Sequence, residues 1–194
     1  IKTNIKSDCI LDRHHTSRRL ESLIASLGEK KCKIYLIHGE LADGQLTWLY
    51  QQPSMRAMIN IAHGEGYGLP LFEAAYNGLP LVTLPWSGQM DFIRKLNKKG
   101  KAVPLIVRVD YDLKNVQKEA VWNGVIQADS MWAFAKETSY KRALRDALDK
   151  RQHHDQRAQT LKKHILKNFT TEKIYADFVN SLGVSLKEIS PATI

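Results

Sequence analysis

The stretch over residues 56–84 reads RAMINIAHGEGYGLPLFEAAYNGLPLVTL, and its order of apolar and turn residues is the strongest structural signal in the chain. The apolar run over 56–62 predicts a strand, which a glycine-rich loop follows at once. Pro70 has the favoured position in the first turn of a helix, and Gly78 is expected to end that helix. The apolar run over 81–84 predicts a second, buried strand. This order of strand, loop, helix and strand is typical of a parallel α/β sheet.

The same alternation continues toward the N-terminus. Leucine and isoleucine recur at helical spacing over 16–27, which predicts an amphipathic helix. The run KIYLI over 33–37 predicts a strand, and Asp43 is expected to cap a helix that reaches Tyr50. A further strand and helix therefore precede the central stretch.

Toward the C-terminus the pattern first repeats and then becomes helical. Ser87 is expected to cap a helix through Ile93, and the apolar run over 102–109 predicts another strand. We expect the remainder to be mainly helical, with Thr171 capping a last helix that Gly183 ends.

These elements predict an α/β fold with a doubly wound parallel sheet and a helical C-terminal extension. We expect one sheet domain over residues 1–135, helices that pack on or beside it over 136–183, and a tail over 184–194.

The composition limits the classes of protein that are possible. The 194 residues are 43% hydrophobic, which is enough for a core, and the net charge of +9 predicts an anionic partner. Nucleic acid, a phosphorylated small molecule and an anionic membrane surface all fit that charge. No apolar run approaches the length of a spanning helix, so we expect a cytoplasmic protein. Cys9 and Cys32 have neither the number nor the spacing of a disulfide scaffold or a zinc site.

The glycine-rich loop is the predicted ligand site. In an open parallel sheet, ligands bind at the carboxyl ends of the strands, where this loop is expected to lie. Gly64, Gly66 and Gly68 let the backbone approach a ligand closely, and the following helix directs its positive N-terminal end there. These features favour a phosphate group. Two acids, Glu65 and Glu73, flank the site with seven residues between them.

The motif E-GYGLPLF-E, followed by AAYNGLPLV, resembles the donor-site signature of the retaining glycosyltransferases of family 4. That resemblance implies the Rossmann-like C-terminal half of a GT-B fold. It also implies a retaining hexosyltransferase that moves a sugar from a nucleoside-diphosphate sugar to an acceptor. The acceptor, whether saccharide, lipid or protein, stays open. The family needs no catalytic metal, so we expect no metal and no cofactor.

The resemblance also implies roles for individual residues. Glu65 would be the catalytic carboxylate, contacting hydroxyls of the transferred sugar near its anomeric carbon. Glu73 would accept hydrogen bonds from the ribose, and the loop over 39–41 would border the base. The implied donor-binding residues are Glu73, Gly66, Tyr67, Gly68, Leu69, His63, Gly39, Glu40 and Leu41.

The chain departs from the family pattern at its start. A GT-B enzyme has an N-terminal acceptor-binding domain, and its donor domain opens with a strand followed by an Arg and a Lys that clamp the diphosphate. Residues 1–5 are expected to form the second strand of that domain. We therefore expect this chain to be one part of the active enzyme.

Two other functions remain alternatives. The chain could be a non-catalytic nucleotide or carbohydrate-binding module that works beside a partner chain. It could also be a basic nucleic-acid binder, but the ten Lys and Arg residues over 136–167 are interleaved with Tyr140 alone among aromatic residues, so nucleic acid is not expected. A solvated helix face is the simplest interpretation of this basic stretch. An anionic membrane surface or a lipid phosphate is the sharper alternative.

Overall fold

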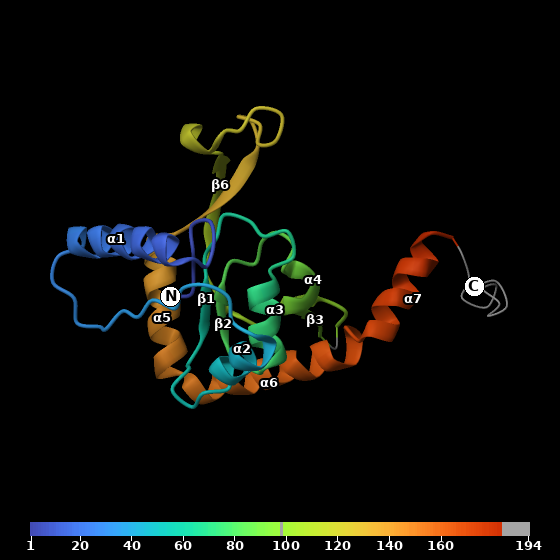
Figure 1. The fold of residues 1–194 in the computed structure, drawn as a ribbon. Helices are drawn as coiled ribbons and strands as arrows, with labels where there is room; N and C mark the ends of the chain where they lie inside the picture. Colours follow the sequence, from blue (N-terminus) through green and yellow to red (C-terminus); the bar gives the residue numbers. More distant parts are fainter. Residues whose placement is uncertain (98, 184–194) are drawn as a thin grey trace. The chain divides into compact units, whose positions relative to one another are not determined.

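The computed structural model describes residues 1–97 and 99–183 and divides the chain into two compact units, Ile1–Trp48 and Leu49–Ile194 (Figure 1). The expected tail over 184–194 lies outside the described residues.

The first unit contains helix α1, Ile10–Ser26, and the first residues of α2, Asp43–Tyr50. Helix α1 begins earlier than predicted because Cys9 caps it, its thiol accepting a hydrogen bond from the backbone N–H of Asp12. Asp12 is buried and accepts bonds from two backbone N–H groups and from Nε2 of His38, each at 3.0 Å. This polar centre organises the start of the unit.

The strand predicted over 33–37 is wrong. A single parallel bridge joins Lys2 to Ile37, and the expected strand over 1–5 amounts to the same bridge. The exposed side chains of Ile34 and Tyr35 give the physical reason: an apolar run becomes a strand only where neighbouring elements bury it.

The second unit contains the predicted parallel sheet. Strands β1 (Met58–Asn60), β2 (Leu81–Thr83) and β5 (Val107–Arg108) pair in parallel in the order β1-β2-β5. The register places Ile59 beside Val82 and Val82 beside Val107. The α/β fold class is thereby confirmed.

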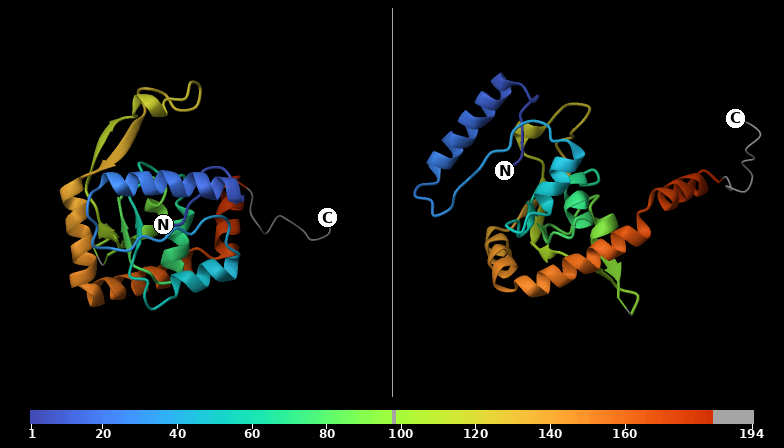
Figure 2. Two further views of the ribbon diagram at one scale, coloured as in Figure 1. Left: turned by 60° about the vertical axis from the view of Figure 1, so that its left-hand side comes forward. Right: turned by 60° about the horizontal axis from the view of Figure 1, so that its bottom comes forward.

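Helices cover this sheet and make the core (Figure 2). Helix α3 (Leu69–Tyr76) packs against β1, β2 and α6 (Arg151–Asn168), while α5 (Glu137–Asp149) packs against β2 and β5. Each large apolar side chain buried here contributes about 1.5–3 kcal/mol. The fully buried members with the largest side chains are Phe92, Leu71, Leu81, Leu84, Ile93, Leu161, Ile165, Val82 and Val109.

The strand predicted over 102–109 is in fact two strands. Strand β4 (Ala102–Pro104) pairs antiparallel with β3 (Arg94–Leu96), and only β5 joins the parallel sheet. Pro104 cannot donate a ladder hydrogen bond, and the N–H of Leu105 turns to the carbonyl of Ile93. The chain therefore changes sheets between the two strands.

The prediction that the remainder is mainly helical misses a β arm. Strands β6 (Tyr111–Asn115) and β7 (Met131–Ala135) pair antiparallel, with a short 3₁₀ helix at Lys118–Ala120 in the connection. In Figure 1 this arm is the yellow hairpin beyond the parallel sheet.

Two of the shorter helices begin at other residues than predicted. Helix α4 is limited to Met90–Ile93, and Gln89 rather than Ser87 precedes it. Helix α7 is Thr171–Ser181, and its cap is Thr170 instead of Thr171, with Oγ1 accepting from the N–H of Lys173. No helix within residues 1–97 and 99–183 is long and apolar enough to cross a bilayer.

Candidate functional site

The glycine loop lies where it was predicted, between the carboxyl end of β1 and the N-terminus of α3. Gly68 is the residue before the helix, and its φ of +86° is one that side chains other than glycine rarely adopt. No side chain caps the helix start. The first turn of α3 therefore directs its positive end toward whatever binds at the loop.

Ser87 and Gly88 hold this loop in place from the far side. The Oγ of Ser87 accepts a hydrogen bond from the N–H of Glu65 at 3.1 Å and donates to the carbonyl of Glu65 at 2.7 Å. The N–H of Gly88 donates to the same carbonyl at 3.1 Å. A Cβ at Gly88 would lie 1.9 Å from the carbonyl oxygen of Gly66, so only glycine fits there.

Ser87 itself is backbone-strained. Its φ of +68° lies in the left-handed region, which costs a residue with a Cβ about 1–2 kcal/mol. The three hydrogen bonds between Glu65 and the Ser87–Gly88 turn offset this cost. These hydrogen bonds thus fix the loop that carries the first acid and hold Ser87 in its strained conformation.

The carboxylate of Glu65 has a specific partner. The side-chain amide of Asn60, the last residue of β1, donates to Oε1 of Glu65 at 2.7 Å, and Oδ1 of Asn60 accepts from the N–H of Ala62 at 2.8 Å. Glu65 is half-buried. One oxygen is therefore oriented by the protein, and the carboxylate as a whole remains partly open to a ligand.

The second acid, Glu73, lies on α3 beside Tyr50. Burial raises the pKa of Tyr50 to about 12, and the negative charge of the neighbouring Glu73 carboxylate adds to this rise. Only 8% of Tyr50 is exposed. The phenol therefore stays protonated at neutral pH, and its hydroxyl donates to the carbonyl of Pro70 at 3.5 Å with the Glu73 carboxylate nearby.

His63 connects the loop to the β arm. Its ring lies between Trp132, stacked at 5.2 Å between centroids, and Phe134 at 4.3 Å, and Nδ1 is 2.8 Å from the carbonyl oxygen of Ala133. Because a carbonyl can only accept, Nδ1 must carry the proton. Nε2 is then the nitrogen with which a neutral His63 could accept a hydrogen bond from a ligand. The donor-binding role of His63 stays a prediction.

The remaining loop residues divide into exposed and packed positions. Tyr67 packs on Phe72 and Phe92, and burial, with Asp91 nearby, raises the pKa of its phenol. Leu69 is 61% exposed at the helix start. A Cβ at Gly66 would meet nothing within 4 Å, so this glycine faces open space in the described part of the chain.

Residues 39–41 belong to the first unit. Gly39 is buried with a φ of +84°, Glu40 is exposed, and Leu41 is half-buried. Their contact with a base stays a prediction, as do the roles of Glu65 and Glu73.

The sequence did not indicate three residues that lie against the predicted acids. Asn60 and Ser87 form hydrogen bonds with Glu65, and Tyr50 lies beside Glu73. A polar residue at the end of an apolar strand was a usable signal for Asn60. Nothing in the local sequence marks Tyr50 as a neighbour of Glu73, because the two residues are brought together only by packing. Within residues 1–97 and 99–183, no three His, Cys, Asp or Glu side chains gather in a way that could hold a metal ion.

A parallel sheet with a glycine loop before a helix N-terminus fits a glycosyltransferase of the GT-B type. The family model described as "UDP-glucoronosyl and UDP-glucosyl transferase" matches residues 46–166, and the chain belongs to this family. The matched range includes the glycine loop, Tyr50, Asn60 and Ser87, whereas residues 39–41 lie outside it. No curated protein and no solved structure is similar enough to this chain to count as a match.

Proposed function

We propose that this chain binds the sugar donor of a UDP-sugar-dependent glycosyltransferase and contributes its catalytic carboxylate. The observation that carries the proposal is the glycine loop, tied to Ser87 and Gly88 at the carboxyl end of β1, with Glu65 inside it. Membership of a UDP-sugar transferase family supports uridine as the base.

The diphosphate has a natural place at the loop. The N–H groups around Gly66 and Gly68 and the start of α3 supply hydrogen bonds and positive potential to an anion. When the bond to the sugar breaks, negative charge accumulates on the departing diphosphate. Fixed donors placed there in advance lower the barrier because they need no reorganisation.

The two acids then have separate tasks. Glu73, beside the phenol of Tyr50, accepts hydrogen bonds from the ribose hydroxyls. Glu65, oriented by Asn60, lies toward the sugar, where a carboxylate stabilises the positive charge that develops at the anomeric carbon. Transfer with retention, as in family 4, and a hexose as the transferred group complete the proposal. The size of the coupling between the anomeric proton and H2 in the product, measured by NMR and compared with that in the donor, distinguishes retention from inversion.

A binding experiment tests the donor site directly. We expect UDP and UDP-glucose to raise the melting temperature of the chain, and GDP and ADP to raise it less. Glu73→Ala should reduce the UDP-dependent shift because the ribose loses its acceptor. Glu172→Ala, which removes an exposed acid from the first turn of α7, is the matched control and should leave the shift unchanged. Equal shifts in wild type and Glu73→Ala would contradict the assignment of Glu73.

A further inference from the structure

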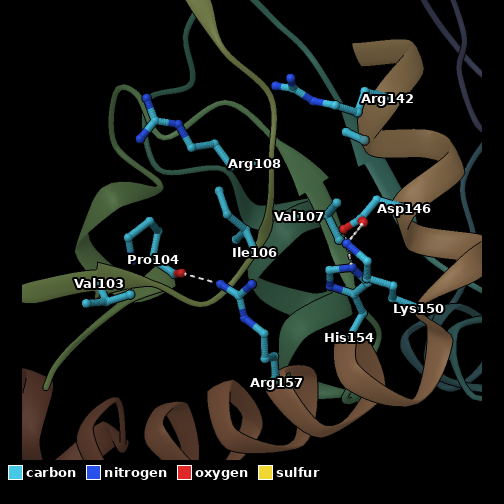
Figure 3. A pocket seen from close by; sticks show the side chains of 11 residues that line it. Val103, Pro104, Ile106, Val107, Arg108, Arg142, Asp146, Lys150, His154 and Arg157 are labelled. Atoms are coloured by element: carbon cyan, nitrogen blue, oxygen red, sulfur yellow. Dashed lines mark hydrogen bonds and ion pairs between the residues drawn. The ribbon is translucent and has the colours of Figure 1, made fainter. Parts of the chain in front are cut away.

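A pocket lies at the other edge strand of the parallel sheet, away from the glycine loop (Figure 3). It has a volume of about 450 Å³ and is formed by the chain leading into β5, the second half of α5 and the start of α6. The glycine loop follows β1, at the opposite end of the strand order β1-β2-β5. The two places are therefore separate sites on the same unit.

Four basic side chains line this pocket. Arg108 comes from β5, Arg142 from α5, Lys150 from the corner between α5 and α6, and Arg157 from α6. Figure 3 shows Arg157 and Lys150 on one side of the pocket and Arg108 and Arg142 on the other. Residues distant in sequence thus place their charges around one cavity.

The acids around the pocket do not balance these cations. Asp110 pairs with Arg108 at 2.9 Å and with Arg142 at 3.3 Å, and Asp146 pairs with Lys150 at 2.6 Å. Two carboxylates thus face four side chains that are positive at neutral pH. The excess of two positive charges matches the charge of a phosphate dianion.

Hydrogen bonds hold the side chains that form the wall of the pocket. His154 is only 5% exposed, and its Nε2 lies 2.8 Å from Oδ2 of Asp146. Arg157 is half-buried, and within the described residues its guanidinium makes one hydrogen bond, 2.7 Å to the carbonyl of Pro104. A guanidinium has five N–H donors, so others remain for a ligand.

The N-terminus of α6 adds to the positive electrostatic potential of the pocket. Lys150, His154 and Arg157 follow one another at helical spacing, so the first turns of this 18-residue helix border the pocket. No side chain caps its N-terminus. Ile106 and Val107 supply an apolar floor, where a charge-assisted hydrogen bond is stronger than in water.

We infer that this pocket is a second anion site, which binds a phosphate group through Arg142, Lys150 and Arg157. The phosphate can belong to a free phosphorylated metabolite or to a lipid headgroup, because both present the same oxygens. The inference does not depend on the donor site, since none of these residues belongs to the glycine loop.

Calorimetry with inorganic phosphate at constant ionic strength tests the site. We expect the double variant Arg142→Ala/Lys150→Ala to bind phosphate at least about tenfold more weakly than wild type. Both side chains are mostly exposed, so the variant should keep its melting temperature. The control is Lys141→Ala/Arg145→Ala, which removes the same charge from exposed positions of α5 outside the pocket and should bind like wild type.

A vesicle-binding experiment distinguishes a lipid headgroup from a free phosphorylated metabolite. Cosedimentation with vesicles of phosphatidylcholine and phosphatidic acid is compared with phosphatidylcholine alone. Vesicle binding that the double variant loses and its control keeps, without binding of free phosphate, would assign the site to a lipid headgroup. Phosphate binding that depends on Arg142 and Lys150 would assign it to a soluble ligand. If neither probe distinguishes the double variant from its control, the anion site does not exist.

Discussion

The amide of Asn60 and the carboxylate of Glu65 are joined by a 2.7 Å hydrogen bond across the turn from strand to glycine loop. The same amide accepts from the N–H of Ala62, so a single side chain fixes both the loop backbone and the acid within it. The orientation of the proposed catalytic carboxylate is therefore decided at the end of β1.

Replacing Asn60 with alanine should reduce glycosyl transfer at least about tenfold with a smaller change in donor affinity, because Glu65 loses its orienting donor. The loss of two hydrogen bonds should also cost about 1–2 kcal/mol of stability. Gln51→Ala is the control. The side-chain amide of Gln51 donates a 2.9 Å hydrogen bond to Asn77, which is not part of the glycine loop. Transfer assays with UDP-glucose give the comparison, and equal turnover in Asn60→Ala and wild type would contradict the role.

Tyr50→Phe should weaken UDP binding because α3 loses the hydrogen bond from the phenol to Pro70, and Glu73 loses its neighbouring hydroxyl. Tyr76→Phe, which changes an exposed tyrosine on α3, should not. Calorimetric titration of UDP into both variants gives the answer. A Tyr50→Phe variant that binds UDP as tightly as wild type would show that Glu73 needs no positioning from this side.

The same phenol predicts a difference at high pH. Its pKa is about 12 in the folded chain against 10 in the unfolded chain, so its contribution to stability is complete below pH 10 and is lost as the pH rises toward 12. Tyr50→Phe removes this titration. Between pH 10 and 12 the stability of wild type should fall more steeply than that of Tyr50→Phe, as measured by denaturant unfolding. Parallel curves would mean that the phenol is ionised as easily in the fold as in solution.

Ser87 offers a paired test of strain against hydrogen bonding. Ser87→Ala should destabilise the chain by about 2 kcal/mol, because both hydroxyl bonds to Glu65 are lost while the left-handed backbone stays strained. Ser87→Gly loses the same bonds but relieves the strain, so it should be the more stable of the two variants. Chemical denaturation of both measures the difference. A less stable glycine variant would show that the strain at Ser87 is small.

A substitution at Gly66 tests ligand binding without disturbing the fold. A Cβ there meets nothing within 4 Å, so Gly66→Ala should change stability by no more than about 0.5 kcal/mol. The added methyl group lies where the diphosphate is proposed to bind, so UDP affinity should fall about tenfold. Gly44→Ala, equally unobstructed and in α2, is the control that should bind UDP normally. Unaltered UDP affinity in Gly66→Ala would place the diphosphate elsewhere.

The sequence predicted the central part of the fold because its signals are local. Strand β1, the glycine loop, α3 and β2 follow from apolar runs separated by Gly68, Pro70 and Gly78, and the structure has each of them. The predicted strand over 33–37 failed because its exposed side chains have no neighbours to bury them. The β arm was missed although residues 111–114 alternate apolar and charged side chains, which is the period of a half-exposed strand, because such a short strand depends on pairing with β7.

The two acids of the candidate site could be predicted from the sequence, but the residues that contact them could not. Glu65 and Glu73 follow from their spacing and from the glycines between them. Tyr50 precedes Glu73 by 23 positions and Ser87 follows Glu65 by 22, and no local pattern predicts such contacts. The basic pocket was likewise visible only as a charged stretch, because Arg108 joins it from another element.

The β arm is a separate two-stranded sheet whose base is fastened by Ala133 to His63 and by Lys136 to Asp110. Its connection over 116–130 takes no part in the parallel sheet, so residues can be added or removed there without shifting the register of β1, β2 and β5. The arm is thus a region in which natural variation can accumulate at little cost to folding. Its attachment to His63 places strand β7 beside the glycine loop, so the arm contributes a wall to the candidate site.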